Sequence, residues 1–293
     1  MLLTLKIQFL KGNLLISLEG ERMLMNKDEL IKACRKLGAD EVGVCPIERF
    51  NGVEPSGDPR YVLPSVKSVI VLVHSIPRGW TRGIESHSEW ATTYTRGGHL
   101  DSSITMEIAY NVCSYIEDCN FDAVPIYNYP LEMRGQGIPV KPGRPAPDVI
   151  PDAYFAAHAA GLGQFGQCGL FLTPKYGPRQ QFTVILTNAE IEPDPIITMN
   201  ICDDCGECAK ACHKKAIDTE SFEYIKQTNG DIEIYKIQKE YCASCRSGVL
   251  PNSFWSSADG DRTLAACGRA CIAHLEDKGI LEYQFVNNYR REK

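Results

Sequence analysis

Eight of the 13 cysteines in this 293-residue chain crowd into its last third, and this crowding restricts the possible folds more than any other feature. A disulfide framework is typical of short secreted chains, and it would leave one of 13 cysteines unpaired. The pattern therefore favours metal binding in a reducing compartment, and we expect a cytoplasmic protein. The crowded residues are Cys202, Cys205, Cys208, Cys212, Cys242, Cys245, Cys267 and Cys271. The scattered residues are Cys34, Cys45, Cys113, Cys119 and Cys168.

The first four crowded cysteines, in the run CDDCGECAKAC, have the spacing C-x2-C-x2-C-x3-C. Three thiolates at this spacing, Cys202, Cys205 and Cys208, can hold one iron–sulfur cubane. The fourth, Cys212, points away along the following helix and ligates a different cluster. A zinc site usually separates two C-x2-C pairs by a longer loop. The spacing therefore favours [4Fe–4S] clusters over zinc.

A second quartet follows as Cys242-x2-Cys245 and Cys267-x3-Cys271, interrupted by a long insertion. The logic of two-cluster ferredoxins exchanges the fourth ligands between the quartets. One cluster would then be held by Cys202, Cys205, Cys208 and Cys271. The other would be held by Cys242, Cys245, Cys267 and Cys212. Two adjacent clusters conduct electrons, so we expect an external low-potential donor of the ferredoxin or flavodoxin type.

The composition is that of an ordinary folded protein, with 44% hydrophobic and 23% charged residues. The net charge of −6 argues against a broad basic surface, so nucleic acid is an unexpected partner. No apolar run approaches the roughly 18 residues of a membrane helix, and we expect no membrane span.

The pattern of apolar residues predicts two domains. The first, 25–197, mixes helices at 26–37, 102–118 and 152–160 with strands at 41–47, 68–76 and 122–128. We also expect a hairpin at 169–188 and long loops at 78–101 and 129–151. The second domain, 198–275, contains a hairpin that turns at Asn229-Gly230, and 276–293 is a polar tail.

Residues 1–24 have two lysines and broken apolar runs, so we expect neither a signal peptide nor an anchor. A natural domain start lies at Met25, where Asn26 and Glu29 form a capping box. We therefore expect 1–24 to be a loose extension or a mis-assigned start.

The segment AAGLGQFGQCGLFLTPKYGPRQQFTVILTN, from Ala159 to Asn188, closely resembles the corrinoid-dependent reductive dehalogenases and, more distantly, the epoxyqueuosine reductases. Both families have an AGLGxxG turn, an apolar strand and then an iron–sulfur module. The TPxYGPR stretch from Thr173 to Arg179 is dehalogenase-like in particular. The resemblance implies an α+β fold, in which a nitroreductase-like α/β core holds a base-off cobalamin. A ferredoxin-like domain with two [4Fe–4S] clusters follows that core.

The resemblance also implies a wall that faces the corrin, where glycines let the backbone approach a flat ring. That wall would consist of Gly161, Gly163, Gly166, Tyr176, Gly177 and Arg179. No D-x-H-x-x-G motif is present, so we expect no protein imidazole on cobalt. Gln167 stands where the dehalogenases carry Arg and the epoxyqueuosine reductases carry Lys.

The resemblance implies two kinds of candidate proton donor, an aspartate and a tyrosine. Epoxyqueuosine reductases use an Asp in a D-x-x-P stretch, which points to Asp148 ahead of Pro151, although Asp148 could instead cap the following helix. Dehalogenases use a tyrosine. The tyrosine candidates are Tyr94, Tyr127, Tyr129 and Tyr154.

The first functional hypothesis is an iron–sulfur oxidoreductase whose corrinoid reduces a small organic substrate. The second is a ferredoxin-type electron-transfer protein that reduces or reactivates another corrinoid protein. A third is a binding module whose ancestral cofactor site is empty. A stoichiometric corrinoid in protein purified without oxygen would favour only the first.

Overall fold

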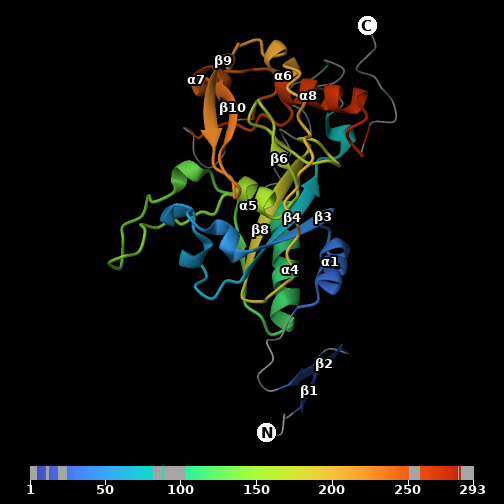
Figure 1. The fold of residues 1–293 in the computed structure, drawn as a ribbon, viewed down its shortest axis with the longest axis vertical. Coiled ribbons are helices and arrows are strands. Elements are labelled where there is room, and N and C mark those ends of the chain that lie inside the picture. The colour runs from blue at the N-terminus through green and yellow to red at the C-terminus, as the bar shows by residue number, and fades with distance from the viewer. Residues whose placement is uncertain are drawn as a thin grey trace.

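A computed structural model describes residues 5–10, 13–18, 25–81, 83, 88, 103–250, 258–282 and 284 (Figure 1). The strands are β1 (Leu5–Leu10), β2 (Asn13–Leu18), β3 (Glu41–Pro46), β4 (Ser68–Ser75), β5 (Ala123–Ile126), β6 (Gln164–Phe165), β7 (Phe171–Leu172), β8 (Gln180–Thr187), β9 (Ile217–Ile225) and β10 (Ile232–Ile237). The labelled α-helices are α1 (Lys27–Lys36), α4 (Thr105–Asp118), α5 (Ala153–Ala159), α6 (Glu207–Lys210), α7 (Lys239–Ala243) and α8 (Ala266–Asp277). Each helix and strand expected in the first domain outside 169–188 is present within a few residues of its expected bounds.

The first domain is built on an antiparallel sheet with the strand order β3-β4-β8-β5. The two central strands read SVIVLVHS and QQFTVILT, and such β-branched runs favour extended backbone. They pair along their whole length, with Ile70 opposite Ile185. All side chains of β8, and all but the last of β4, are buried.

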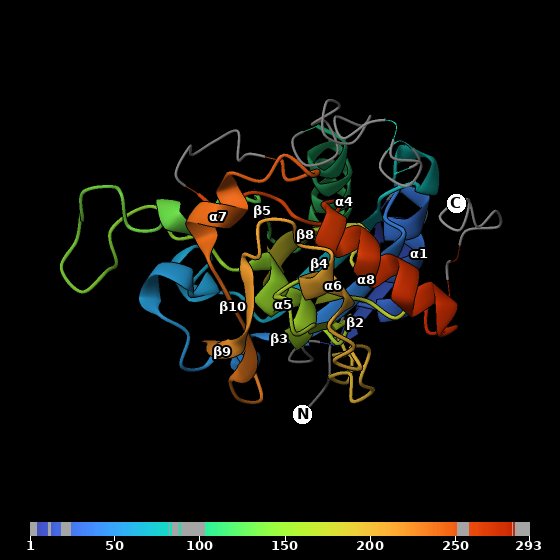
Figure 2. The ribbon, with the colours of Figure 1, turned by 90° about the horizontal axis from the view of Figure 1, so that it is seen from above.

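Both faces of this sheet are covered because alternate side chains of a strand point to opposite sides. Ile70 and Leu72 pack with α1 and α4, whereas Val69, Val71 and Val73 pack with α5. Figure 2 looks down on these layers, with α4 and α5 on opposite sides of β8 and β4. The result is a three-layer core, and the mixture of helices and strands in this region is as predicted.

The hairpin expected at 169–188 is wrong. The short strand β7 pairs instead with β6, in the register Phe165 to Phe171. The strand β8 lies between β4 and β5 in the central sheet. A tight turn closed by Thr173 and Gly177 separates the two strands and sends them to different sheets. The apolar pattern identified both strands but not their partners.

The cysteine-rich segment forms a module at the top of Figure 1. It contains α6, α7, α8 and the expected hairpin of β9 and β10. Its apolar core includes Ile201, Ile217 and Leu275, and also Cys168 and Leu172 from the preceding region. The strand pair β6-β7 therefore lies between the two cores, with Phe165 and Phe171 packed against the sheet domain and Leu172 against the module.

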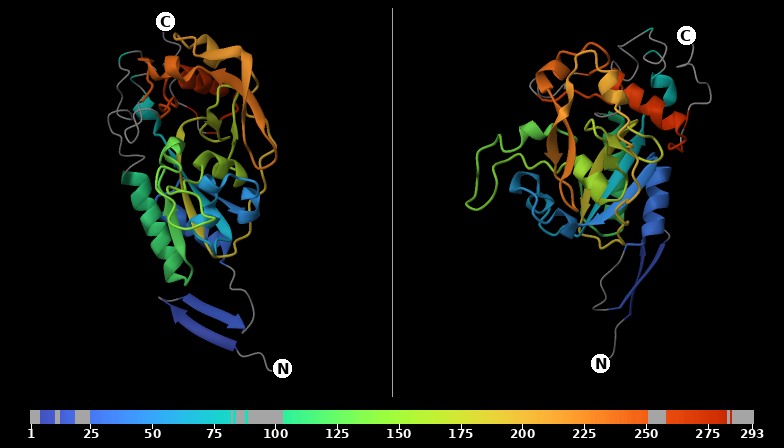
Figure 3. Two further views of the ribbon diagram at one scale, coloured as in Figure 1. Left: turned by 90° about the vertical axis from the view of Figure 1, so that its left-hand side faces the viewer. Right: turned by 45° about the horizontal axis from the view of Figure 1, so that its top comes forward.

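Two further segments lie at the edges of the molecule. The strands β1 and β2 pair with each other as a hairpin that Figure 1 shows away from the sheet. The expected long loop 129–151 projects on one side, as Figure 3 shows, with Ile138 and Val140 exposed. Within the described ranges, no helix has the combined length and hydropathy that crossing a membrane requires.

Candidate metal centre

The first group of thiols converges between α6 and α8. Gly206, with a φ of 70°, starts the short helix α6, which carries Cys208. Cys271 lies four residues after Cys267 on α8, so both face the same side of that helix. The thiol of Cys271 interacts electrostatically with those of Cys202 and Cys205, and Cys208 interacts with Cys271.

The second group of thiols forms where α7, the start of α8 and the end of the first cysteine run meet. The thiol of Cys242 interacts with those of Cys245 and Cys212, and Cys267 interacts with Cys242 and Cys212. Burial raises the pKa of Cys267 to about 12, which the guanidinium of Arg262 opposes. The crowded thiols therefore lie in one module, and their interactions also cross between the two predicted sets, as that of Cys271 with Cys267 shows.

Backbone N–H groups point at three of these sulfur atoms. The N–H of Gln167 lies 3.5 Å from Cys202 Sγ, that of Ala216 lies 3.3 Å from Cys212 Sγ, and that of Ser247 lies 3.4 Å from Cys245 Sγ. Donors of this kind stabilise sulfur that carries negative charge. The sulfur atoms therefore have an environment suited to thiolates.

Cys168 is a ninth thiol in the same place, and sequence analysis did not group it with the others. It is 3% exposed and shares a hydrogen bond with Cys208. It also interacts with Cys271 and Cys267, one from each predicted set. The backbone carbonyl of its neighbour Gln167 accepts a hydrogen bond of 2.7 Å from Tyr235 on β10, which fixes this loop to the module.

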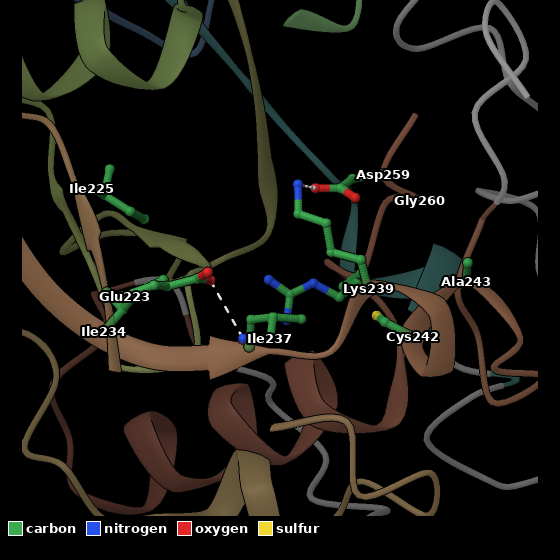
Figure 4. A pocket seen from close by; sticks show the side chains of 11 residues that line it. Glu223, Ile225, Ile234, Ile237, Lys239, Cys242, Ala243, Asp259 and Gly260 are labelled. Carbon is green, nitrogen blue, oxygen red and sulfur yellow. Dashed lines mark hydrogen bonds and ion pairs between the residues drawn. The ribbon is translucent and has the colours of Figure 1, made fainter. Parts of the chain in front are cut away.

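A cavity of about 260 Å³ lies beside the second thiol group, between the β9-β10 hairpin and α7 (Figure 4). Ile225, Ile234 and Ile237 form its apolar wall. Lys239 and Asp259 form an ion pair of 2.8 Å at its rim, and Cys242 and Arg262 complete the lining. Charged groups and a predicted cluster ligand therefore share one cavity.

Asp203, Cys205 and His274 place three possible ligand atoms within 4.8 Å of one another. Asp203 accepts hydrogen bonds of 2.8 and 2.9 Å from His274 Nε2, and this contact lowers the pKa of the carboxyl group. The Asp203–His274 pair therefore lies beside Cys205, one of the predicted cluster ligands.

The turn from Gly161 to Gly166 is filled by the chain itself. A Cβ at Gly161 would lie 2.0 Å from the carbonyl oxygen of Pro195, and a Cβ at Gly163 would lie 2.1 Å from that of Leu172. A Cβ at Gly166 would lie 2.9 Å from the Leu172 side chain. Packing against the protein therefore explains why these positions lack side chains.

The TPxYGPR stretch is also packed inside the protein. Tyr176 is 4% exposed, and the positive φ of 62° at Gly177 forms the tight turn. Arg179 is fully buried, and its Nη2 lies 3.3 Å from Glu276 Oε1 on α8. This arginine therefore joins the first domain to the cysteine-rich module.

The predicted proton donors occupy separate places. Asp148 is exposed in the projecting loop. It is not the cap of α5, because Asp152 accepts the hydrogen bonds from the N–H groups of Tyr154 and Phe155. Sequence reasoning missed Asp152, although an Asp directly before an Ala-rich helix is a recognisable cap signal. Burial raises the pKa of Asp152, and those two N–H groups oppose the change.

The candidate tyrosines also differ in environment. Tyr154 lies among the rings of Phe165, Phe171 and Phe182, with centroid distances of 5.8 to 6.0 Å. The rings of Tyr127 and Tyr129 lie 4.5 Å apart near β5. Tyr94 lies outside the described residues.

Comparison with known proteins shows which enzymes this chain is similar to. No protein-family model matches the chain. The tetrachloroethene reductive dehalogenase of Dehalobacter restrictus is 28% identical over 156 residues, which cover 51% of this chain and 24% of that protein. The epoxyqueuosine reductase of Bacillus subtilis is 21% identical over 222 residues, which cover 65% of this chain and 51% of that protein. The chain is a homologue of both groups of enzymes. Both groups are oxidoreductases.

The solved structures agree at the level of the fold. A catabolic reductive dehalogenase superposes with a TM-score of 0.53 at 20% identity, covering 79% of this homologue and 30% of that chain. The homologue therefore spans about half or less of the length of the relatives described here. Its fold is shared with the reductive dehalogenase structure.

Proposed function

We propose that this chain is an iron–sulfur reductase that binds two [4Fe–4S] clusters and passes low-potential electrons to a substrate site in its first domain. The observation that supports the proposal is the gathering of the crowded thiols in one small module, where Cys242, Cys267 and Cys271 each interact with several others. The homology to two families of oxidoreductases supports a redox role for that module.

The residues present fit such clusters. One set would be Cys202, Cys205, Cys208 and Cys271, and the other would be Cys242, Cys245, Cys267 and Cys212. Bound clusters would supply one-electron transfer. The chain's own contribution is to hold the thiols in place, to donate N–H groups to three sulfurs and to keep Arg262 beside the second set.

The finer form of the proposal adds a corrinoid as the electron acceptor, and this rests on the families alone. The six residues expected to face a corrin do not form an open cradle, because the chain itself covers them. We therefore assign no step to a corrinoid. A small organic molecule is the proposed substrate class.

The second candidate function is electron transfer without a corrinoid, to another corrinoid protein. The glycine turn favours this function, because the chain itself fills the space that a corrin would need beside these glycines. An external ferredoxin- or flavodoxin-type donor is part of both proposals.

We predict about eight iron and eight sulfide per chain after anaerobic reconstitution. Cys205→Ser should reduce the iron content by about half, since it removes a ligand of one cluster. Cys119→Ser is the control and should keep full iron, because Cys119 packs with α1 and α4 in the sheet domain and not with the cysteine-rich module. Chemical iron and sulfide analysis measures both.

Cys168→Ser tests whether the ninth thiol is a ligand in addition to the eight proposed ones. If Cys168 is not a ligand, this variant keeps full iron. Wild-type protein with about four iron would contradict the two-cluster proposal.

Cobalamin binding decides between the two candidate functions. Protein purified with added cobalamin, without oxygen, is desalted and its cobalt content is measured. One cobalt per chain supports the corrinoid enzyme, and full iron without cobalt supports the electron-transfer protein.

A further inference from the structure

Arg262 has an unusual position in the loop that leads into α8. Its Nη1 is buried and makes no hydrogen bond among the described residues. Gly169, with a φ of 72°, leaves the space for it, since a Cβ at that position would lie 3.3 Å from Arg262 Nη2. Arg262 as a whole is half-buried, but a buried Nη1 without a hydrogen bond is costly, so some negative charge is expected to lie near it.

The two carboxylates that line the same cavity as Arg262 do not form an ion pair with it. Asp259 faces Arg262 across the cavity, but its carboxylate is engaged at 2.8 Å by Lys239. Glu223, on the opposite wall, accepts a hydrogen bond from the N–H of Ile237. Neither carboxylate has an ion pair with Arg262 in the described part of the chain.

The strongest interactions of Arg262 are with thiols, and that with Asp259 is weaker. Burial by itself would lower the pKa of this guanidinium, but the thiols of Cys267, Cys168 and Cys242 together raise it. Cys267 and Cys242 belong to the second proposed quartet. The cation therefore lies where four thiolates would gather negative charge.

We propose that Arg262 balances the negative charge of the cluster held by the second quartet and so raises the reduction potential of that cluster. The inference rests on the proposed function. A [4Fe–4S] core with four thiolates carries two net negative charges when oxidised and three when reduced by one electron. A fixed positive charge stabilises the reduced form more, because the attraction grows with the charge of its partner.

The electron balance of this step is simple. One electron from an external reductant, dithionite in the experiment, converts the core from the 2+ to the 1+ state. Arg262 keeps its proton throughout, since a guanidinium is not deprotonated in proteins. No bond is made or broken, so Arg262 is a positioning residue and its effect is purely electrostatic.

The test compares Arg262→Gln, Arg262→Lys and the control Lys239→Gln in the reconstituted full chain. Lys239 lines the same cavity, but its side chain is 62% exposed and paired with Asp259. Redox titration followed by electron paramagnetic resonance gives the midpoint potential of each cluster. Cys245→Ser, which should lose the second cluster, shows which signal belongs to which quartet.

Arg262→Gln should make reduction of the second cluster about tenfold less favourable, a shift of about 59 mV to lower potential for one electron. Arg262→Lys should return the midpoint toward the wild-type value, and Lys239→Gln should change it much less. The midpoint potential of the first cluster should shift less than that of the second in every variant.

Several outcomes overturn the inference. One is Arg262→Gln protein with full iron and both midpoints unchanged. Another is an equal shift, or an equal loss of the second cluster, in Arg262→Gln and Arg262→Lys, which would indicate a packing role. Loss of the second cluster in Arg262→Gln alone supports charge balance. Wild-type protein that lacks the second cluster would instead refute the proposed function, so the two failures are distinguishable.

Discussion

His74, at the residue scale, is a buried imidazole whose charge state affects folding. It lies on β4 with 2% exposure, and its Nε2 is 3.1 Å from Thr183 Oγ1 on the neighbouring β8. Burial lowers the pKa of His74 to about 4. The imidazole is therefore neutral in the folded protein at pH 7.

This predicts a loss of stability in mild acid. Because the folded-state pKa is below the unfolded value of about 6.5, the unfolded chain takes up a proton first as the pH falls. Between pH 7 and pH 5 the cost to folding is about 2 kcal/mol from this residue alone. Urea unfolding of wild type and His74→Gln at both pH values measures it. If the two proteins lose the same stability on acidification, the burial argument for His74 is wrong.

The scattered cysteines contrast with the crowded ones at the same scale. Cys34, Cys45 and Cys113 lie in the apolar cores on the two faces of the sheet. Burial raises the pKa of each thiol to about 12. These residues therefore act as small apolar side chains rather than as nucleophiles or ligands.

At the element scale, the turn after α5 depends on glycine. Gly161 combines a φ of 72° with a Cβ direction that meets the Pro195 carbonyl at 2.0 Å. We expect Gly161→Ala to lower the free energy of unfolding by about 2 kcal/mol or more, since backbone strain and a steric clash add. Thermal or urea unfolding measures the effect.

The matched control for this turn is Gly143→Ala. Gly143 has a similar φ of 76° but nothing within 4 Å of its Cβ position. Gly143→Ala should lower the free energy of unfolding by only about 1 kcal/mol, the cost of placing a residue with a side chain at a positive φ. Equal effects at the two positions would mean that the contact with Pro195 is unimportant.

At the scale of the whole molecule, the ion pair of Arg179 and Glu276 joins the sheet domain to α8. The arginine side chain is fully buried and that of Glu276 is 11% exposed. Glu276→Gln removes the carboxylate charge and leaves the buried guanidinium, so we expect a loss of about 3 kcal/mol. The pair of Lys67 and Glu190 is the control, since both side chains are at least 40% exposed and the pair is worth about 1 kcal/mol or less.

Unfolding experiments on Glu276→Gln and Lys67→Gln test this prediction. A similar small change in both variants would show that the contact between the domains does not depend on the buried pair.

Local sequence patterns predicted most of the elements of the first domain, and cysteine spacing led to the proposal of two sets of ligands. β-branched runs and four-residue apolar spacing encode local structure directly, as β4 and α4 show. Cysteine spacing along a turn and a helix limits which sulfurs can share a cluster, and on that ground we propose that Cys202 and Cys271 are ligands of the same one. The AGLG and TPxYGPR stretches were enough to indicate the two families of relatives.

Which segments meet became clear from the fold. The partner of β7, the burial of Arg179 against α8, the ninth thiol Cys168 and the cation Arg262 all depend on contacts between residues far apart in the chain. A local pattern records the face that a residue presents but not what packs against it. That is why sequence could propose the ligands of the clusters, whereas the charge that surrounds them required the fold.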